Sequence, residues 1–318
     1  MTAIRKHPPT LNATLWCAAS LIIWLGVTAA FIGIRPEHIF LAIAMAAMFF
    51  ANPASRRLVV ALIPFALFGI SYDWMNLLPN YMVNSVDIEQ LYLTEKSLFG
   101  IPFAGSVLTP NEWCALHTCT AADILAGIFY LCWVPLPIAF GLWLYFTGRR
   151  GQYLHFALVF LLVNLIGFTF YYIHPAAPPW YVAMHGFEFI PGTHGEVAGL
   201  GAFDTLTSSS IVQTLYGRNS NVFAAMPSLH SAYTLVALIY AVRYRVGAVV
   251  TAILAIVTAG IWATAVYTSH HYILDVLGGI ACAFAGYLLF EFALMRIPAF
   301  ARFISKYTSY ISPANART

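Results

Sequence analysis

The sequence has little charge. Aspartate, glutamate, lysine and arginine make up 8% of its 318 residues, whereas 61% are hydrophobic. Because a soluble domain carries about a quarter charged residues, this composition excludes an ordinary soluble protein and indicates a polytopic membrane protein. The formal net charge of only +3 gives no indication of a nucleic-acid partner.

Cysteine is also scarce. Five cysteines at scattered positions exclude a disulfide framework. Cys114 and Cys119, in NEWCALHTCTAAD, are the only close pair outside a clear apolar segment. The spacing is compatible with one small loop disulfide in an oxidising compartment, and equally with two free thiols.

What the chain has in abundance is long apolar runs. A membrane-spanning helix needs about 20 apolar residues. Five segments meet this length: 13–34, 123–146, 152–173, 247–268 and 272–295. The segment 227–242 is slightly short, and 39–52 and 58–72 predict either a hairpin of two helices around Arg56 and Arg57 or a re-entrant segment. The first run is too long for the core of a cleavable signal peptide, which has roughly 7–15 residues, so we expect it to be retained.

The basic residues gather on one side of the eight predicted spans. With the N-terminus inside, the inner face holds twelve of them: Arg5, Lys6, Arg56, Arg57, Arg149, Arg150, Arg243, Arg245, Arg296, Arg302, Lys306 and Arg317. The outer face holds three: Arg35, Lys96 and Arg218. Since lysine and arginine in short loops mark the cytoplasmic side, both termini are predicted in the cytoplasm. The long segments 73–122 and 174–226 are then outside.

Two stretches place titratable residues at the outer ends of predicted spans. The first is YTSHHYILDVLGG, residues 267–279. In it, His271 and Asp275 are four residues apart and would share one face of a helix. The carboxylate would then fix the imidazole tautomer and leave the other ring nitrogen as a nucleophile or base. The alternative is a structural His–Asp pair that holds the helix end. His270 would point about 100° away on such a helix, so we leave it out of the predicted catalytic set.

The second stretch is AAMPSLHSAYT, residues 224–234. A proline at a helix start gives up an amide that would be unpaired anyway, and the remaining first-turn amides favour an anion, typically phosphate. Ser228, through its hydroxyl, and Leu229, in the first turn, are therefore predicted to bind phosphate. His230 would protonate a leaving oxygen. The alternative is a capped helix with an interfacial histidine.

These stretches, together with HPAAPPWY (174–181), resemble the signature motifs of the type 2 phosphatidic acid phosphatase superfamily, and more closely those of fungal inositol phosphorylceramide synthases. The resemblance covers about residues 123–295. It implies an all-α membrane protein with a six-helix core, formed by the third to eighth spans, and two additional N-terminal helices. It also implies that His271 attacks phosphorus to give a phosphohistidine, that Asp275 orients it, and that His230 serves as acid and then base.

Three cations of the phosphatase pattern are missing. Gly167 stands at the lysine position, His174 at the first arginine and Ala265 at the second. A phosphate monoester carries close to two negative charges, which are expensive to bury without cations, whereas a phosphodiester carries one. The absence favours a phosphodiester donor such as a glycerophospholipid. His174 would contact phosphate or hold its loop, and Arg218 would supply a cation or be a solvated loop charge.

The predicted function is therefore transfer of a phosphoryl head group, by the resemblance phosphoinositol, from a glycerophospholipid to a ceramide, another lipid or a glycan alcohol. A lipid phosphate or prenyl pyrophosphate phosphatase, which uses water, is the alternative in the same fold. A metal or proton-coupled transporter, with zinc on His230, His271 and Asp275, is the alternative of another class, although transporter sites usually lie near the membrane midplane. We expect no cofactor and no resident metal.

The predicted organisation follows from the spans. Residues 1–72 hold the N-terminal helices, of which the third (about 58–72) belongs to the core; residues 73–122 form an outer loop; 123–295 form the catalytic core with the outer loop 174–226; and 296–318 form a cytoplasmic tail. The short loops and tails favour a bacterial inner membrane with the site facing the periplasm. The lumenal face of an organelle is the alternative.

Overall fold

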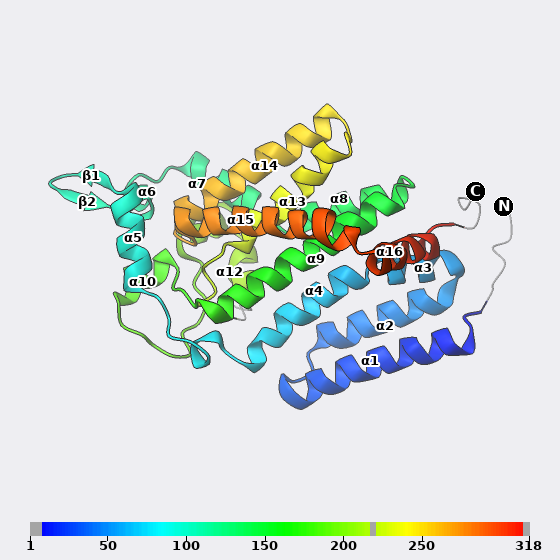
Figure 1. Cartoon of the computed structure of the whole chain (residues 1–318). Coiled ribbons are helices and arrows are strands. Elements are labelled where there is room, and N and C mark those ends of the chain that lie inside the picture. Colours follow the sequence, from blue (N-terminus) through cyan, green and yellow to red (C-terminus); the bar gives the residue numbers. More distant parts are fainter. Residues whose placement is uncertain (1–7, 217–220, 314–318) are drawn as a thin grey trace.

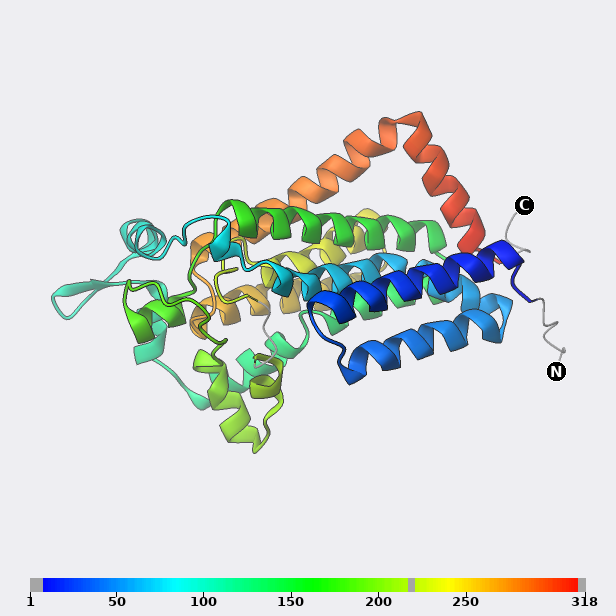
Figure 2. The ribbon, with the colours of Figure 1, turned by 90° about the horizontal axis from the view of Figure 1, so that it is seen from below.

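Apolar helices lying side by side form most of the molecule (Figures 1 and 2). The computed structural model describes residues 8–216 and 221–313. The bundle helices are α1 (Leu11–Phe31), α2 (Pro36–Ala51), α3 (Pro53–Ala61), α4 (Ile63–Trp74), α7 (Thr120–Leu131), α8 (Pro135–Phe146), α9 (Arg150–Ile173), α13 (Leu229–Arg243), α14 (Ala248–Tyr267) and α15 (Ile273–Leu288). This architecture confirms the all-α membrane class predicted from the sequence.

Two of the predicted spans are broken helices. Among the described residues, four helices are long and apolar enough to cross a membrane: α1, α9, α14, and α15 with its continuation to Arg296. The pairs α3–α4 and α7–α8 bend by 47° and 45° and raise the count to six. The predictions of single helices over 58–72 and 123–146 were wrong because Pro64 and Pro135 lie in the first turns of new helices, which begin at Ile63 and Pro135. The missing amide of proline interrupts the hydrogen-bond ladder there. Helix α2, with 16 residues, is shorter.

The predicted outer loops contain secondary structure of their own. Helix α5 (Glu89–Phe99), a hairpin of β1 (Ile101–Phe103) and β2 (Ser106–Leu108), and α6 (Pro110–Leu116) make up much of the first segment. The second contains α10 (Pro179–His185), α11 (Gly201–Thr207) and α12 (Ile211–Tyr216). Helices α5, α6 and α10 and the hairpin lie at the end of the bundle opposite α3 and α16 (Pro298–Ile311) (Figure 1). We call the described residues of these two segments, 73–122 and 174–226, together the outer cap.

Helix α9 is the centre of the core. It contacts α4, α8, α13, α15 and α16, and Phe156, Phe160 and Val163 are fully buried in it. Its one deeply buried amide, on Asn164, accepts a hydrogen bond from the Tyr233 hydroxyl and donates to the Phe160 carbonyl. The polar side chain is thus satisfied inside an apolar environment, as burial requires.

A charged network holds the opposite end of the core. Glu291, in a short π-helix (Leu289–Ala293) that continues α15, accepts hydrogen bonds from Tyr240 and Arg243 and lies 2.9 Å from the His155 ring nitrogen. Its side chain is only 4% exposed, and a carboxylate so deeply buried needs such partners. Beyond it, the predicted cytoplasmic tail contains α16, which packs on α3 and α9.

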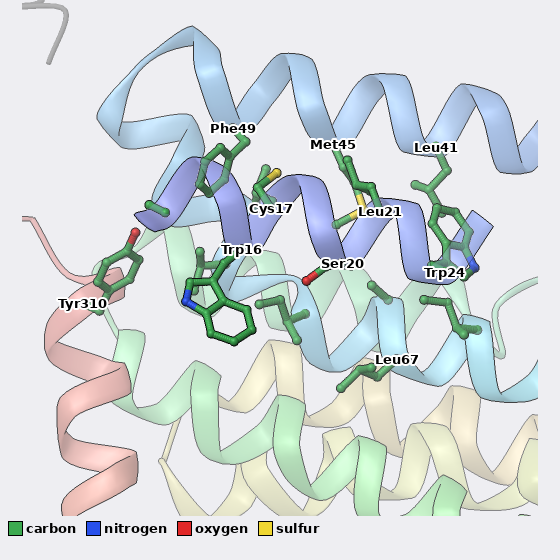
Figure 3. A pocket seen from close by; sticks show the side chains of 16 residues that line it. Trp16, Cys17, Ser20, Leu21, Trp24, Leu41, Met45, Phe49, Leu67 and Tyr310 are labelled. Atoms are coloured by element: carbon green, nitrogen blue, oxygen red, sulfur yellow. The ribbon is translucent and has the colours of Figure 1, made fainter. Parts of the chain in front are cut away.

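The N-terminal helices enclose an apolar cavity. It has a volume of about 380 Å³ and lies between α1, α2, α3 and α4, with Tyr310 of α16 at one end (Figure 3). Its labelled side chains include Trp16, Trp24, Met45 and Phe49. None of its lining residues belongs to the two motif stretches. In the outer cap, Cys114 and Cys119 are both free thiols, so the free-thiol alternative holds.

One glycine allows the two motif-bearing helices to meet. A Cβ atom at Gly279 of α15 would lie 2.0 Å from the main-chain oxygen of Ser228. We predict that Gly279→Ala destabilises the protein by roughly 1–3 kcal/mol or more, because backbone cannot yield as a flexible side chain does. Thermal unfolding in detergent measures this. Gly26→Ala, with no heavy atom within 4 Å of the new carbon, is the control; equal melting of the two variants would contradict the prediction.

Candidate active site

The two adjacent histidines lie in a turn rather than on a helix. Helix α14 ends at Tyr267, and Ser269 adopts a positive φ of 58°. The amides of His270 and His271 both donate to the Ala265 carbonyl, at 3.1 and 2.9 Å. Helix α15 begins only at Ile273. The 100° separation that we expected between the two rings therefore does not apply, because it assumed helical geometry.

The hydrogen bonds of His271 fix its tautomer. Its Nδ1 lies 3.0 Å from the Ala225 carbonyl oxygen, and a carbonyl can only accept, so Nδ1 carries the hydrogen. The free lone pair is then on Nε2. Burial lowers the pKa of His271 to about 4, and the ring is neutral at pH 7.

Asp275 lies beside the His271 ring, but its carboxylate is not the main hydrogen-bond acceptor of that ring. Its Oδ2 is 3.5 Å from His271 Nδ1 and accepts a 2.8 Å hydrogen bond from the Tyr272 amide. The expectation that Asp275 itself fixes the tautomer was wrong in this respect, because the Ala225 carbonyl takes that position. The carboxylate instead caps α15 and remains close enough to stabilise a positive charge on the imidazole.

His230 faces the lone pair of His271. The His230 Nδ1 is 3.0 Å from His271 Nε2, and because that Nε2 is the acceptor, His230 Nδ1–H is the donor. The ring of Trp133 lies against His230, with a 4.4 Å centroid separation. The structure thus brings together the three residues predicted as catalytic.

The three residues do not converge on one point. His271 turns Nε2 towards His230 and Nδ1 towards Asp275. A single ion cannot be bound from opposite sides of one ring, so this arrangement does not suit the tetrahedral zinc site of the transporter alternative. Within residues 8–216 and 221–313, no group of three or more metal-ligating side chains is placed to hold an ion.

A small pocket of about 80 Å³ opens onto the histidines. The lining residues are Tyr72, Met75, Tyr171, Pro178, Trp180, Tyr216, Asn221, Val222, Ala224, Ala225, His230, His270 and His271. Aromatic rings and imidazoles make up most of this wall. No lysine or arginine is among the lining residues that the structure describes. The sequence-based expectation of a site poor in cations therefore matches this part of the chain.

The residues predicted to bind phosphate lie elsewhere. Ser228 is fully buried; its hydroxyl accepts a hydrogen bond from Ser231, and its amide donates to the Asp275 carbonyl at 2.8 Å. The side chain of Leu229 packs against Gly167. Neither lines the pocket, so the structure does not support direct phosphate contacts from their side chains. Arg218 lies outside the described residues.

His174 lines a different cavity. Its Nε2 is 3.3 Å from an Asp87 carboxylate oxygen, and its ring faces an apolar groove of about 340 Å³ between α9 and α15. Met226 and Pro227 also line this groove. Of its two predicted roles, the structure supports holding the loop, because the contact with Asp87 links the residue after α9 to the first segment of the outer cap.

Sequence reasoning missed His270, which lines the pocket beside the two predicted histidines. Its ring is 5% exposed and lies against Tyr216, at a centroid separation of 4.5 Å. Burial, followed by the neighbouring His271 and His230 rings, holds the pKa of His270 well below its usual range. Finding His270 required predicting the positive-φ turn after α14, and a serine at that position gives no sequence signal of such a turn.

The outer cap is tied to the His271 turn by buried side chains. The Glu95 carboxylate of α5 accepts hydrogen bonds from the amides of Ile273 (2.9 Å) and Leu274 (3.1 Å) at the start of α15. The Asn111 amide of α6 donates to the carbonyls of Val266 and His271, at 2.8 and 2.9 Å. Glu95 is fully buried, and burial raises the pKa of its carboxyl against the effect of the two amides.

Comparison with known proteins matches this site to a family. The PAP2 superfamily model matches residues 104–289, which include both motif stretches. The chain belongs to the PAP2 superfamily. It is 54% identical over 303 residues to the phosphoinositol dihydroceramide synthase of Bacteroides thetaiotaomicron, covering 95% of this chain and 99% of that protein.

More distant relatives are fungal. The inositol phosphorylceramide synthase of Candida albicans is 30% identical over 186 residues, which are 54% of this chain and 37% of that protein. The catalytic subunit AUR1 of the Saccharomyces cerevisiae enzyme is 31% identical over 132 residues, 41% of this chain and 31% of that protein. No solved structure matches the chain. The resemblance inferred from the motifs, to the superfamily and to its synthase branch, is thereby confirmed.

We predict that Glu95 positions His271. Glu95→Ala leaves two partly buried amides without their acceptor, at up to about 1–3 kcal/mol each. Glu95→Gln replaces one acceptor with an NH₂ group that opposes an amide N–H. Both variants should melt at lower temperature, and turnover should fall roughly tenfold to hundredfold because the nucleophile is displaced.

The control is Glu89→Gln, on an exposed position of the same helix. It should melt and turn over like the wild-type protein. A Glu95→Gln variant with wild-type melting and turnover would show that the carboxylate does not hold the site.

Proposed function

We propose that this membrane protein transfers phosphoinositol from phosphatidylinositol to the hydroxyl of a ceramide-type lipid, through a phosphohistidine on His271. The contact between His271 Nε2 and His230 Nδ1, inside a pocket with no described lysine or arginine, is the observation that carries the proposal. The names of the relatives give the head group and the lipid class.

In the first half of the reaction, His271 Nε2 attacks phosphorus and the bond from phosphorus to the glycerol oxygen breaks. His230, in its imidazolium form, gives its Nδ1 proton to the departing diacylglycerol oxygen. The phosphorylated His271 ring carries a positive charge, since Nδ1 keeps its hydrogen. The Ala225 carbonyl and the Asp275 carboxylate lie on that side of the ring to stabilise the charge.

In the second half, the hydroxyl of the acceptor lipid attacks the same phosphorus. His230 now takes the hydroxyl proton as a base, and the bond from phosphorus to Nε2 breaks. The nucleophile is regenerated as the neutral tautomer that its hydrogen bond to Ala225 already favours. His230, neutral in the free protein, takes up a proton from solvent when the anionic donor binds; it gives one proton in the first half and takes one in the second, so the protons balance over the cycle.

The charge of the pocket favours a diester over a monoester. A phosphodiester brings one negative charge, which a protonated His230 balances, whereas a monoester brings close to two. Burying the second charge against aromatic rings, without a further cation, is costly. The phosphatase alternative therefore suits this pocket less well than head-group transfer.

The aromatic wall also favours transfer over hydrolysis. Trp133 and Tyr130 lie against His230, at centroid separations of 4.4 and 5.6 Å, and His271 is 6% exposed. A phosphohistidine in such a site is poorly accessible to bulk water. A lipid hydroxyl would reach it from the bilayer; the apolar groove is lined by Met226 and Pro227, which directly follow Ala224 and Ala225 of the pocket in the sequence.

The site is proposed to face the periplasm of a bacterium. The Arg-rich ends of α3, α9 and α13 lie away from the outer cap, which is the arrangement expected when lysine and arginine remain in the cytoplasm. The pocket is formed beneath the outer cap, by its residues and by His230 at the start of α13. The lipids would therefore react in the outer leaflet of the inner membrane.

We expect purified protein in mixed micelles to move label from phosphatidylinositol, labelled in its phosphoinositol group, into a dihydroceramide acceptor. His271→Ala removes the nucleophile and should lower transfer by roughly 10³-fold or more. His117→Ala, at an exposed histidine of the outer cap, is the matched control. Label that appears only in water would make the protein a hydrolase, and transfer that survives in His271→Ala would exclude the phosphohistidine.

We expect a membrane-impermeant thiol reagent to label Cys119 in intact cells, because this thiol is exposed in the outer cap. Cys119→Ser should remove most of the labelling, since the remaining four cysteines are partly or fully buried. Labelling of Cys119 only after the inner membrane is permeabilised would reverse the proposed orientation.

A further inference from the structure

A third imidazole in the pocket has no role in the proton transfers described above. His270 is 5% exposed, lines the pocket with His230 and His271, and is flanked by the rings of Tyr216 and Tyr130 at 4.5 and 6.1 Å. The main-chain carbonyl of Glu196 also faces this ring. A buried polar ring at a substrate pocket calls for an account of each of its nitrogens.

Hydrogen accounting assigns the tautomer of His270. The Thr268 hydroxyl donates its only hydrogen to the Thr264 carbonyl, at 2.7 Å. The 2.9 Å contact between Thr268 Oγ1 and His270 Nδ1 must then be donated by the ring. In the neutral imidazole, the lone pair is therefore on Nε2.

That Nε2 atom is buried and makes no hydrogen bond within the described residues. A buried acceptor without a hydrogen bond is unfavourable. A protein retains such an acceptor where a bound ligand supplies the missing hydrogen bond. The partner must be a hydrogen donor. This excludes ionised phosphoryl oxygens and hydrocarbon chains, and it points to a hydroxyl group. A neutral ring is also the form that the neighbouring histidines favour, since a second positive charge beside His230 would be repelled.

We propose that His270 Nε2 accepts a hydrogen bond from a ring hydroxyl of the transferred polyol and so selects an inositol-bearing donor lipid. This inference rests on the function proposed above. His270 is then a substrate-binding and specificity residue, and no bond to it forms or breaks. The position of His270 directly before His271 supports this inference, because a head group attached to His271 stays within reach of the adjacent His270 in the same turn.

Donors with altered head groups test this inference. We would compare phosphatidylinositol with analogues in which each ring hydroxyl in turn is replaced by hydrogen, in the wild-type protein, His270→Leu and His270→Gln. Wild-type kcat/KM should fall about tenfold to hundredfold for one analogue, because the site's buried acceptor is then left unpaired. His270→Leu should show a similar loss with phosphatidylinositol and no further loss with that analogue. His270→Gln, which places a carbonyl oxygen near the former Nε2, should recover part of the selectivity.

A loss in His270→Leu that is equal for all donors, with wild-type discrimination kept, would make the residue structural and overturn the inference. So would an unchanged rate of phosphohistidine formation with slowed transfer, because His270 would then bind the acceptor hydroxyl. His117→Leu is the matched control. If the wild-type protein fails to use phosphatidylinositol at all, the proposed function fails and this inference with it, whereas failure of His270 alone leaves the proposed function standing.

Discussion

The free amides at the start of α15 are the constraint on which the site depends. A helix leaves its first amides without intrahelical partners, and here they lie partly or fully buried beneath the outer cap. Glu95 accepts from Ile273 and Leu274, and Asp275 accepts from Tyr272. Because Glu95 comes from the outer cap, the turn that carries His270 and His271 is completed only when the cap is folded onto the bundle. The cap therefore helps to shape the candidate site, although it supplies none of the atoms proposed to react.

Hydrogen bonds between neutral groups also explain how the pocket can contain so few charged side chains. Its histidines are neutral in the free protein, held by a carbonyl, a hydroxyl and each other. Neutral rings tolerate burial among tyrosines and tryptophans far better than lysine or arginine would. In the proposed mechanism this sets a limit on the substrate: the site would accommodate one negative charge, balanced by one proton that His230 takes up on binding. The absence of lysine and arginine from the described lining and the presence of aromatic rings around the histidines both suit a site that keeps water out.

The features that depend on local sequence pattern were predicted well. Long apolar runs located the helices, and two short motifs located His230, His271 and Asp275, which the structure brings together. The features that depend on turns, or on partners far apart in the sequence, were predicted poorly. His270 was set aside because a helix was assumed where Ser269 makes a positive-φ turn. Ser228 was assigned to phosphate although its hydroxyl is fully buried and accepts a hydrogen bond from Ser231. Glu95 lies 178 residues before Ile273, and no periodicity reveals a cap contributed from that far.

In the proposed mechanism, the closeness of the His230 and His271 rings has a consequence for the order of events. With 3.0 Å between His230 Nδ1 and His271 Nε2, no phosphorus atom fits between attacking nitrogen and acid, although an in-line displacement requires phosphorus and the leaving oxygen to lie between them. Donor binding must therefore separate the rings and replace their hydrogen bond with contacts to the phosphoryl group. Until a donor arrives, the proposed nucleophile, His271, is covered by the proposed acid, His230. A site that opens only around its lipid does not expose His271 to water or to small phosphates, and this protects the transfer reaction at the step where hydrolysis would otherwise compete.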